Sequence, residues 1–379
     1  MGPLEGLLVV ELAGLGPGPF CAMVLADLGA DVMRVDRVES VTGGHTPSTR
    51  NDLLNRGKRS VAVDLKQAAG VEVVLGLVAG ADALIEGYRP GVTERLGLGP
   101  AECLARNPDL VYGRMTGWGQ TGPMAGAAGH DIDYIALSGA LGSIGTTERP
   151  IPPLNLVGDF GGGGLILALG VVSAILWSRR NGVGQVVDAA MTDGSALLMT
   201  SHHGYLSEGW WVADRESNLF DGAAPFYTTY PASDGRHLAV GALEPRFYAE
   251  LLQVLDLDPE TLPDQLDRTG WARLRQEIGD RFASRTREEW ERRFDGTDAC
   301  VVAVLDMAEA PGHPHNLERA TFVEVDGITQ PAPAPRFSGT PAEISRPPGF
   351  PGEHTDEIVL SLGYSRDDLG MLRRSGAIA

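Results

Sequence analysis

Apolar positions in the first two hundred residues alternate between short runs and longer stretches with helical spacing. The short runs predict β-strands at Leu7–Glu11, Asp31–Val35, Ser60–Val63, Ala83–Ile85 and Leu110–Met115. Helical spacing falls between them, at Phe20–Leu28 and Ala68–Leu77. Strands that alternate with helices in this way form a parallel sheet with helices on its faces. The pattern therefore predicts a doubly wound α/β domain.

The pattern changes after about residue 200, where two β-rich runs, Phe226–Tyr230 and His237–Val240, flank a turn-forming segment typical of a hairpin. Helices are predicted behind it at Pro245–Leu255 and, after the capping box of Thr286 and Glu289, at Arg287–Phe294. We therefore expect a Rossmann-like large domain over 1–200, a linker over 201–224 and a smaller α+β domain over 225–329. Residues 330–379 are expected to form a proline-rich linker and a C-terminal return to the large domain.

One apolar stretch, Phe160–Trp177, carries no charged residue and has about the length of a minimal membrane span. The glycines at 161–164 and at Gly170, with Ser173, make it a poor membrane helix. We predict instead a buried helix behind a glycine-rich entry loop, and no membrane span.

The net charge and the cysteine content exclude several classes of partner and site. A net charge of -19 argues against nucleic-acid or membrane-surface binding, because both partners are polyanionic. The three cysteines are widely spaced and form no CxxC pair, so neither a disulfide framework nor a thiolate metal site is indicated. With no secretory signal at the N-terminus, the expected location is cytoplasmic.

The turn after the first predicted strand has the sequence GLGPGPF from Gly14. Gly14 and Gly16 match the opening of a dinucleotide-binding GxGxxG, and Asp36 lies where that motif has its ribose-binding acid. Pro19 replaces the third glycine, which prevents close packing of the helix on the strand. A nicotinamide-dependent oxidoreductase is therefore a weaker alternative, and it would depend on added nucleotide.

Cations gather between residues 50 and 66, against the acidic trend of the chain. The segment holds Arg50, Arg56, Lys58, Arg59 and Lys66, and the cations Arg34, Arg37 and Arg89 lie near the same predicted strands. Flexible cations beside a parallel sheet suit a ligand with several phosphates. A solvated charged loop is the alternative.

Two residues with acid/base chemistry each follow a glycine and stand just ahead of a predicted helix. His130 lies in GHDIDYIALSG, and Asp159 lies in PPLNLVGDFGGGG. The free backbone N–H groups and the positive dipole end at a helix start suit an anion or a developing enolate oxygen, here near Asp131. Alone, either residue could also serve only as a helix cap.

Sequence motifs run through the whole chain in a recognisable order: GPFCAMVLADLGADV from Gly18, EGYRPGV from Glu86, the two motifs above, GQVVDAAM from Gly184, FDGAAPFYTTY from Phe220, VGALEPRFY from Val240, FDGTDAC from Phe294 and GEHTDEI from Gly352. Together they resemble the alpha-methylacyl-CoA racemases, of the class III CoA-transferase (CaiB/BaiF) superfamily. The resemblance implies interconversion of (2R)- and (2S)-2-methylacyl-CoA, no metal or other cofactor, and an interlocked homodimer. Its active site would lie between the large domain of one chain and the small domain of the other.

By this resemblance His130 and Asp159 are the catalytic acid/base pair, and Glu244 hydrogen-bonds His130 and holds its ring. Asp133 departs from the family, where Asn is usual, which puts the CoA contacts and the basicity of His130 in question. The CoA-binding residues implied by matching position are Arg37, Val63, Asp64, Leu65, Lys66, Ala81, Asp82, Ala83, Arg89, Gly129, Asp131, Ile132, Asp133 and Tyr134.

Inversion at the carbon next to a thioester requires one group to remove a proton and a second to return one on the opposite face. An imidazole and a carboxylate can exchange these roles near neutral pH. The main alternative is a CoA-transferase in which Asp159 is the nucleophile that accepts the acyl group; His130 favours the racemase, because a transferase needs no second base. A non-catalytic acyl-CoA binder would keep its affinity without either residue.

Overall fold

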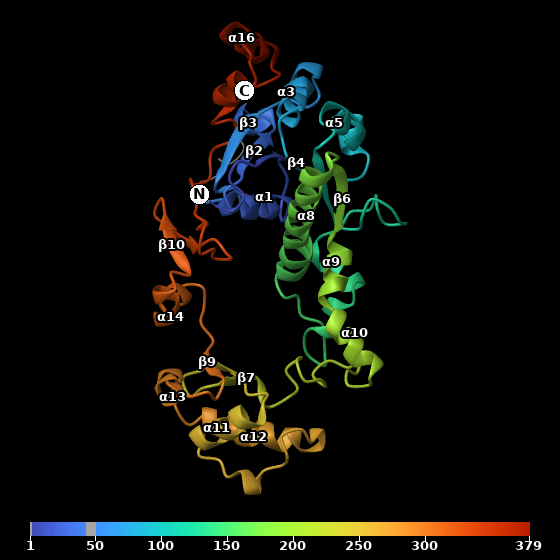
Figure 1. Cartoon of the computed structure of the whole chain (residues 1–379). Coiled ribbons are helices and arrows are strands. Elements are labelled where there is room, and N and C mark those ends of the chain that lie inside the picture. The colour runs from blue at the N-terminus through green and yellow to red at the C-terminus, as the bar shows by residue number, and fades with distance from the viewer. Residues whose placement is uncertain (1, 43–50) are drawn as a thin grey trace. The chain divides into compact units, whose positions relative to one another are not determined.

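The computed structural model describes residues 2–42 and 51–379, which divide into two compact units (Figure 1). The larger unit comprises the described residues up to Ser138, together with Pro153–Leu198 and Leu317–Ala379. The smaller unit comprises Gly139–Pro152 and Met199–Asn316. Each unit has its own apolar core.

A parallel sheet forms the centre of the larger unit, with six strands in the part of the chain that the structure describes. The strands are β1 (Leu8–Leu12), β2 (Asp31–Asp36), β3 (Lys58–Ala62), β4 (Ala83–Glu86), β5 (Val111–Thr116) and β6 (Gln185–Ala190). Their order is β3-β2-β1-β4-β5-β6, so the chain reverses its direction of winding between β1 and β4. The predicted α/β fold is confirmed, and β6 is an edge strand that the apolar pattern did not predict.

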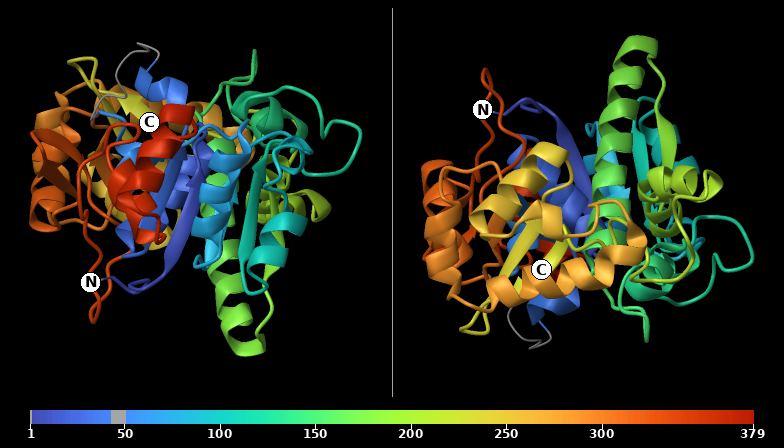
Figure 2. Two further views of the ribbon diagram at one scale, coloured as in Figure 1. Left: turned by 90° about the horizontal axis from the view of Figure 1, so that it is seen from above. Right: turned by 90° about the horizontal axis from the view of Figure 1, so that it is seen from below.

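Helices cover both faces of this sheet because successive strand residues point to opposite sides. Val9 faces the core shared with α1 (Pro17–Asp27) and α8 (Ile166–Asn181). Val10 faces the opposite core. That core is shared with helices from both ends of the chain, whose blue and red ribbons lie next to each other in Figure 2. These are α3 (Ala68–Val78), α5 (Pro100–Arg106), α15 (Thr355–Ser361) and α16 (Arg366–Ser375). The other α-helices and strands that lie wholly in this unit are α2 (Val38–Thr42), α4 (Val92–Arg95), α6 (Asp131–Leu137), α9 (Met191–Leu198), β10 (Phe322–Val325) and β11 (Ile328–Pro331).

A π-helix, η2 (Leu156–Leu165), leads directly into α8, where a glycine-rich loop was predicted. The loop prediction is wrong because these glycines provide space rather than a turn. A Cβ on Gly162 would lie 2.6 Å from the backbone nitrogen of Ser195, and one on Gly164 would lie 2.7 Å from the ring of Phe20. The glycines therefore let η2 pack tightly against α9 and α1.

The continuous helix 156–181 is the one helix among the described residues that is long and apolar enough to cross a membrane, by length and composition. Its mean hydropathy is 2.0. The α8 side chains of Leu167, Val171 and Ile175 are buried on the sheet. One face of α8 therefore packs like a core helix, whereas Leu169 and Leu176 on its other face are exposed, so the prediction of a buried helix holds for one face only.

The smaller unit combines an antiparallel sheet with helices. Its strands β7 (Tyr227–Pro231) and β8 (His237–Gly241) form the predicted hairpin, and β9 (Val301–Ala303) pairs with β8. The carboxylate of Glu289 accepts the backbone N–H of Thr286 at 2.9 Å, which confirms the predicted start of α13. The helices are α7 (Ala140–Ser143), α10 (Thr200–Ser207), α11 (Pro245–Val254), α12 (Trp271–Phe282), α13 (Arg287–Phe294) and α14 (Pro314–Glu318), the last of which ends in the larger unit.

Candidate active site

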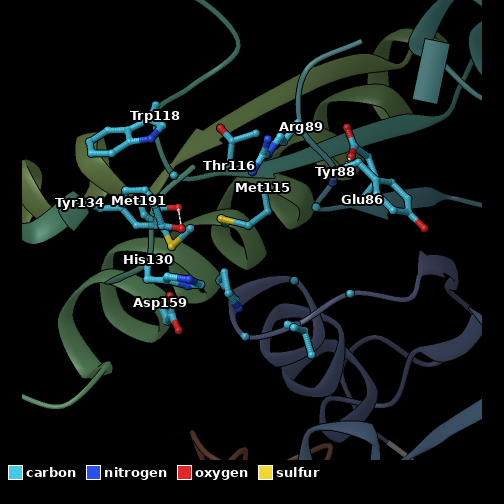
Figure 3. Close-up of a pocket in the computed structure, with 18 of the residues that line it drawn as sticks. Glu86, Tyr88, Arg89, Met115, Thr116, Trp118, His130, Tyr134, Asp159 and Met191 are labelled. Carbon is cyan, nitrogen blue, oxygen red and sulfur yellow. Dashed lines mark hydrogen bonds between the residues drawn. The ribbon is translucent and has the colours of Figure 1, made fainter. Parts of the chain in front are cut away.

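A pocket of about 350 Å³ opens at the carboxyl ends of the central strands of the larger unit (Figure 3). Its walls come from residues 14–19 after β1, 86–90 at the end of β4 and 115–118 at the end of β5. This is the point where the strand order reverses, which is where open α/β sheets bind their ligands. His130 and Asp159 both line this pocket.

Asp159 lies in the first turn of η2 and faces the loop after β1. The Asn155 side-chain amide donates to Asp159 Oδ2 at 3.0 Å. Gly16 has a φ of 66°, and a Cβ there would lie 3.1 Å from the same oxygen. Gly16 therefore allows the chain to turn and to pass close to Asp159.

His130 occupies the N-cap position of α6, and its side chain is exposed at the pocket. Its backbone N–H donates to Asp133 Oδ2 at 2.9 Å, so the Asp133 carboxylate closes the first turn of the helix. A carboxylate in this place is favoured by the helix dipole. An Asn side-chain oxygen at this position could accept the same bond.

Tyr134 and Trp118 form one wall of the pocket and pack edge to face, with ring centroids 4.7 Å apart. The Tyr134 hydroxyl donates to the carbonyl of Gly129, and a Cβ on Gly117 would overlap the Tyr134 ring. Burial, with the charges of Asp159 and Asp133, raises the pKa of Tyr134. The phenol therefore stays neutral and anchors the segment that carries His130.

The loop after β4 is held by a buried carboxylate. Glu86 accepts the backbone N–H of Tyr88 at 2.7 Å and Nε of Arg114 at 2.9 Å. Burial raises the pKa of Glu86, while the Tyr88 N–H and Arg114 oppose the shift. This arrangement places the exposed side chain of Arg89 at the pocket.

Four of the eight predicted phosphate-binding cations are largely buried and form ion pairs with acidic side chains of the protein. Arg34 pairs with Asp36 at 2.7 Å, Arg56 with Asp27 at 2.5 Å and Lys58 with Glu11 at 2.6 Å. Arg59 pairs with Asp31 and Glu357. The prediction is wrong for these four cations, because their charges are matched within the protein. Arg50 lies outside the described residues.

Asp36, the candidate ribose-binding acid, is also engaged. Its Oδ2 accepts Nε of Arg34 at 2.7 Å and the hydroxyl of Ser60 at 2.6 Å. The residue is buried and is not among those that line the pocket. The feature that suggested a dinucleotide site therefore stabilises the interior of the sheet.

The structure brings some of the predicted CoA-binding residues to the pocket and leaves others elsewhere on the larger unit. Arg89, Gly129 and Tyr134 line the pocket with His130 and Asp159. Arg37 and residues 63–66 follow β2 and β3 at the same edge of the sheet, but they do not line the pocket. In that segment Val63 and Leu65 pack into the core, whereas Lys66 is exposed.

Further predicted residues lie away from the pocket or turn from it. Ala81 and Ala83 are buried at the amino end of β4, and Asp82 Oδ2 accepts the backbone N–H of Leu8 at 2.9 Å. Ile132 is exposed on α6, and Asp131 is buried with its carboxylate turned toward η2. Glu244 belongs to the smaller unit, where it is exposed at the N-cap of α11.

Several residues that line the pocket were not predicted from the sequence. Met115 and Trp118 supply apolar surface, and Thr116 and Tyr88 supply hydroxyl groups. The strand predictions placed some of them at carboxyl ends, which is the signal that could have identified them.

The chain is similar in sequence and in structure to known proteins over nearly its whole length. The model of CoA-transferase family III matches residues 4–355. The chain is 49% identical over 371 residues to "Alpha-methylacyl-CoA racemase" of Mus musculus, covering 97% of this chain and 95% of the relative. It is 47% identical over 375 residues to the Homo sapiens protein of that name, covering 97% and 96%. A crystal structure of a CAIB/BAIF family protein from Brucella suis superposes with a TM-score of 0.82 at 26% identity, covering 95% of this chain and 99% of the other.

Proposed function

The chain belongs to CoA-transferase family III, and we propose that within this family it is an alpha-methylacyl-CoA racemase that interconverts (2R)- and (2S)-2-methylacyl-CoA. The observation that carries the proposal is one pocket lined by both an imidazole, His130, and a carboxylate, Asp159. The two racemases that share about half of its residues support the same activity.

In the proposed mechanism His130 and Asp159 act on opposite faces of the α-carbon. One removes the α-proton, a planar enolate forms, and the other returns a proton to the second face. Proton transfer contributes roughly 10²–10⁴ in rate, so stabilisation of the enolate oxygen must supply much of the remainder. We assign this to backbone N–H groups at the start of α6, next to His130.

Binding of the CoA part is proposed for the carboxyl edge of the sheet. Arg89 at the pocket and the exposed side chains of Arg37 and Lys66 after β2 and β3 can meet its phosphates. The neighbouring loops, which include residues 63–66, supply backbone contacts. For Ala81, Asp82 and Ala83 a role in CoA binding stays a prediction.

A second candidate function is CoA transfer with Asp159 as the nucleophile, since the same family model covers transferases. His130 in the same pocket favours racemisation. The test supplies purified (2R)-2-methylacyl-CoA without any acceptor acid and measures the R/S ratio by chiral chromatography. A racemase produces the S epimer under these conditions, whereas a transferase changes nothing until a free acid is added.

We expect racemisation to need no metal ion and no nucleotide, because the two acid/base side chains complete the proton transfers. Dialysis against a chelator should leave kcat unchanged when the R/S ratio is followed. A loss of activity that a divalent ion or NAD restores would contradict this expectation.

The family resemblance supports a homodimer in which Glu244 of one chain holds His130 of the other. Co-expression of His130→Ala with Glu244→Ala should then restore about one active site per mixed dimer, because both defects fall in the same site. Activity of the purified, differently tagged mixed dimer is the measurement.

The matched control for this experiment pairs His130→Ala with Asp159→Ala. Each site of that mixed dimer lacks one acid/base group, so no activity should return. A shared site would be contradicted if the first pair also stayed inactive, or if a monomer proved fully active.

A further inference from the structure

Asp131 joins the two segments that carry the acid/base groups. It is the first residue of α6, directly after His130, and only 8% of it is exposed. Its Oδ1 accepts the backbone N–H of Asp159 at 2.7 Å, and the nearby backbone N–H of Gly158 also favours the charged form of this carboxylate. A side chain from the helix behind His130 thus holds the backbone of η2 at Asp159.

Gly158 is matched to this contact. A Cβ at this position would lie 2.9 Å from Cγ of Asp131 and 3.1 Å from Cγ2 of Ile135. Contacts this short require the neighbouring atoms to move. Glycine at 158 therefore allows the Asp131 carboxylate to reach the backbone of η2.

The contact has an electrostatic cost that a helix cap alone would not require. Burial and the nearby charge of Asp159 raise the pKa of Asp131, while the two backbone N–H groups oppose the shift. Asp133 already closes the start of α6 by accepting the N–H of His130. The Asp131 carboxylate is thus turned away from its own helix and toward Asp159, at a position that disfavours its charge.

We propose that Asp131 is the positioning residue of Asp159. Because it follows His130 in the chain and binds the backbone of Asp159, it fixes how far apart the two acid/base groups lie. Misplacing a reacting group by about 1 Å costs about 10² in rate. This inference rests on the proposed two-base function.

The test compares Asp131→Ala with the conservative Asp131→Asn. We expect Asp131→Ala to lower kcat about 10²-fold with little change in KM. We also expect it to bias α-deuterium exchange of separately supplied R and S thioesters in the same sense as Asp159→Ala. Asp131→Asn keeps an acceptor oxygen, so its kcat should be close to that of the wild type. Gly158→Ala should lower kcat in the same way as Asp131→Ala.

A matched control is Asp221→Ala in the smaller unit, where the Asp221 carboxylate accepts the backbone N–H groups of Ser217 and Asn218. It should lower the melting temperature without favouring α-deuterium exchange of either epimer. The positioning role would be overturned if Asp131→Ala lowered the α-deuterium exchange rate of both epimers equally. It would also be overturned if the exchange were biased toward the same epimer as in His130→Ala.

A second measurement separates this inference from the proposed function. The amide hydrogen of Asp159 should lose protection against solvent exchange in Asp131→Ala while the amides of α8 keep theirs. That result would support the positioning role even if the wild-type protein racemised nothing. Unchanged protection at Asp159 would overturn it, whatever the activity.

Discussion

Replacing His130 with alanine is expected to lower racemisation by about 10²–10⁴, the usual contribution of one acid/base group. Asp159 stays at the pocket and should still exchange the α-proton of one epimer with solvent. Asp159→Ala should show the mirror-image preference. Deuterium uptake measured separately on the R and S thioesters checks both variants.

The control for these variants is His315→Ala, which replaces an exposed histidine of α14 outside the pocket and should leave both exchange rates unchanged. Two outcomes would contradict the two-base mechanism. One is exchange of both epimers by either single variant, and the other is an acyl or CoA adduct on Asp159 in the intact mass of enzyme trapped during turnover.

Lys58→Met is expected to lower the free energy of unfolding by about 3–5 kcal/mol, since removing one partner of a buried ion pair leaves the other charge uncompensated. Lys58 Nζ lies 2.6 Å from Glu11 Oε2, and both side chains are 1% exposed. The ammonium also donates to the carbonyl of Pro19 at 3.0 Å, near the start of α1. Burial lowers the pKa of Lys58, and Glu11 opposes this shift.

The double variant Glu11→Leu/Lys58→Met should recover much of the loss, because an apolar pair of similar volume removes both buried charges. Arg106→Met is the matched control: Arg106 and Glu72 are 2.7 Å apart but about half exposed, so its cost should stay below about 1 kcal/mol. Urea-induced unfolding gives the values. A cost for Lys58→Met no larger than that for Arg106→Met would contradict the importance of burial.

The sheet of the larger unit could be predicted because its strands alternate with helices, and such a chain forms a parallel sheet. The start of α13 could be predicted because a capping box is a local contact, here between Thr286 and Glu289. The pairing of the buried cations with acidic side chains could not be predicted. Arg56 lies 29 residues from its partner Asp27, so a local excess of positive charge suggested solvent or a phosphate ligand instead.

The site was predictable in part for the same reason. His130 and Asp159 lie in recognisable motifs, but only the folded chain places both motifs at the carboxyl edge of the sheet. Glycines are ordinarily signals of turns, whereas those of η2 accommodate close packing. The contact between Asp131 and the backbone of Asp159 spans 28 residues and leaves no local pattern in the sequence.

Racemisation by two acid/base groups is tested by incubating the wild-type protein with pure (2R)-2-methylacyl-CoA in deuterated water. Racemisation through two acid/base groups predicts that the S epimer forms without an acceptor acid and carries deuterium at the α-carbon. The R/S ratio should reach the same value from either starting epimer. An S product that retains its original α-hydrogen, or an R thioester that stays unchanged until a free acid is added, would contradict the account.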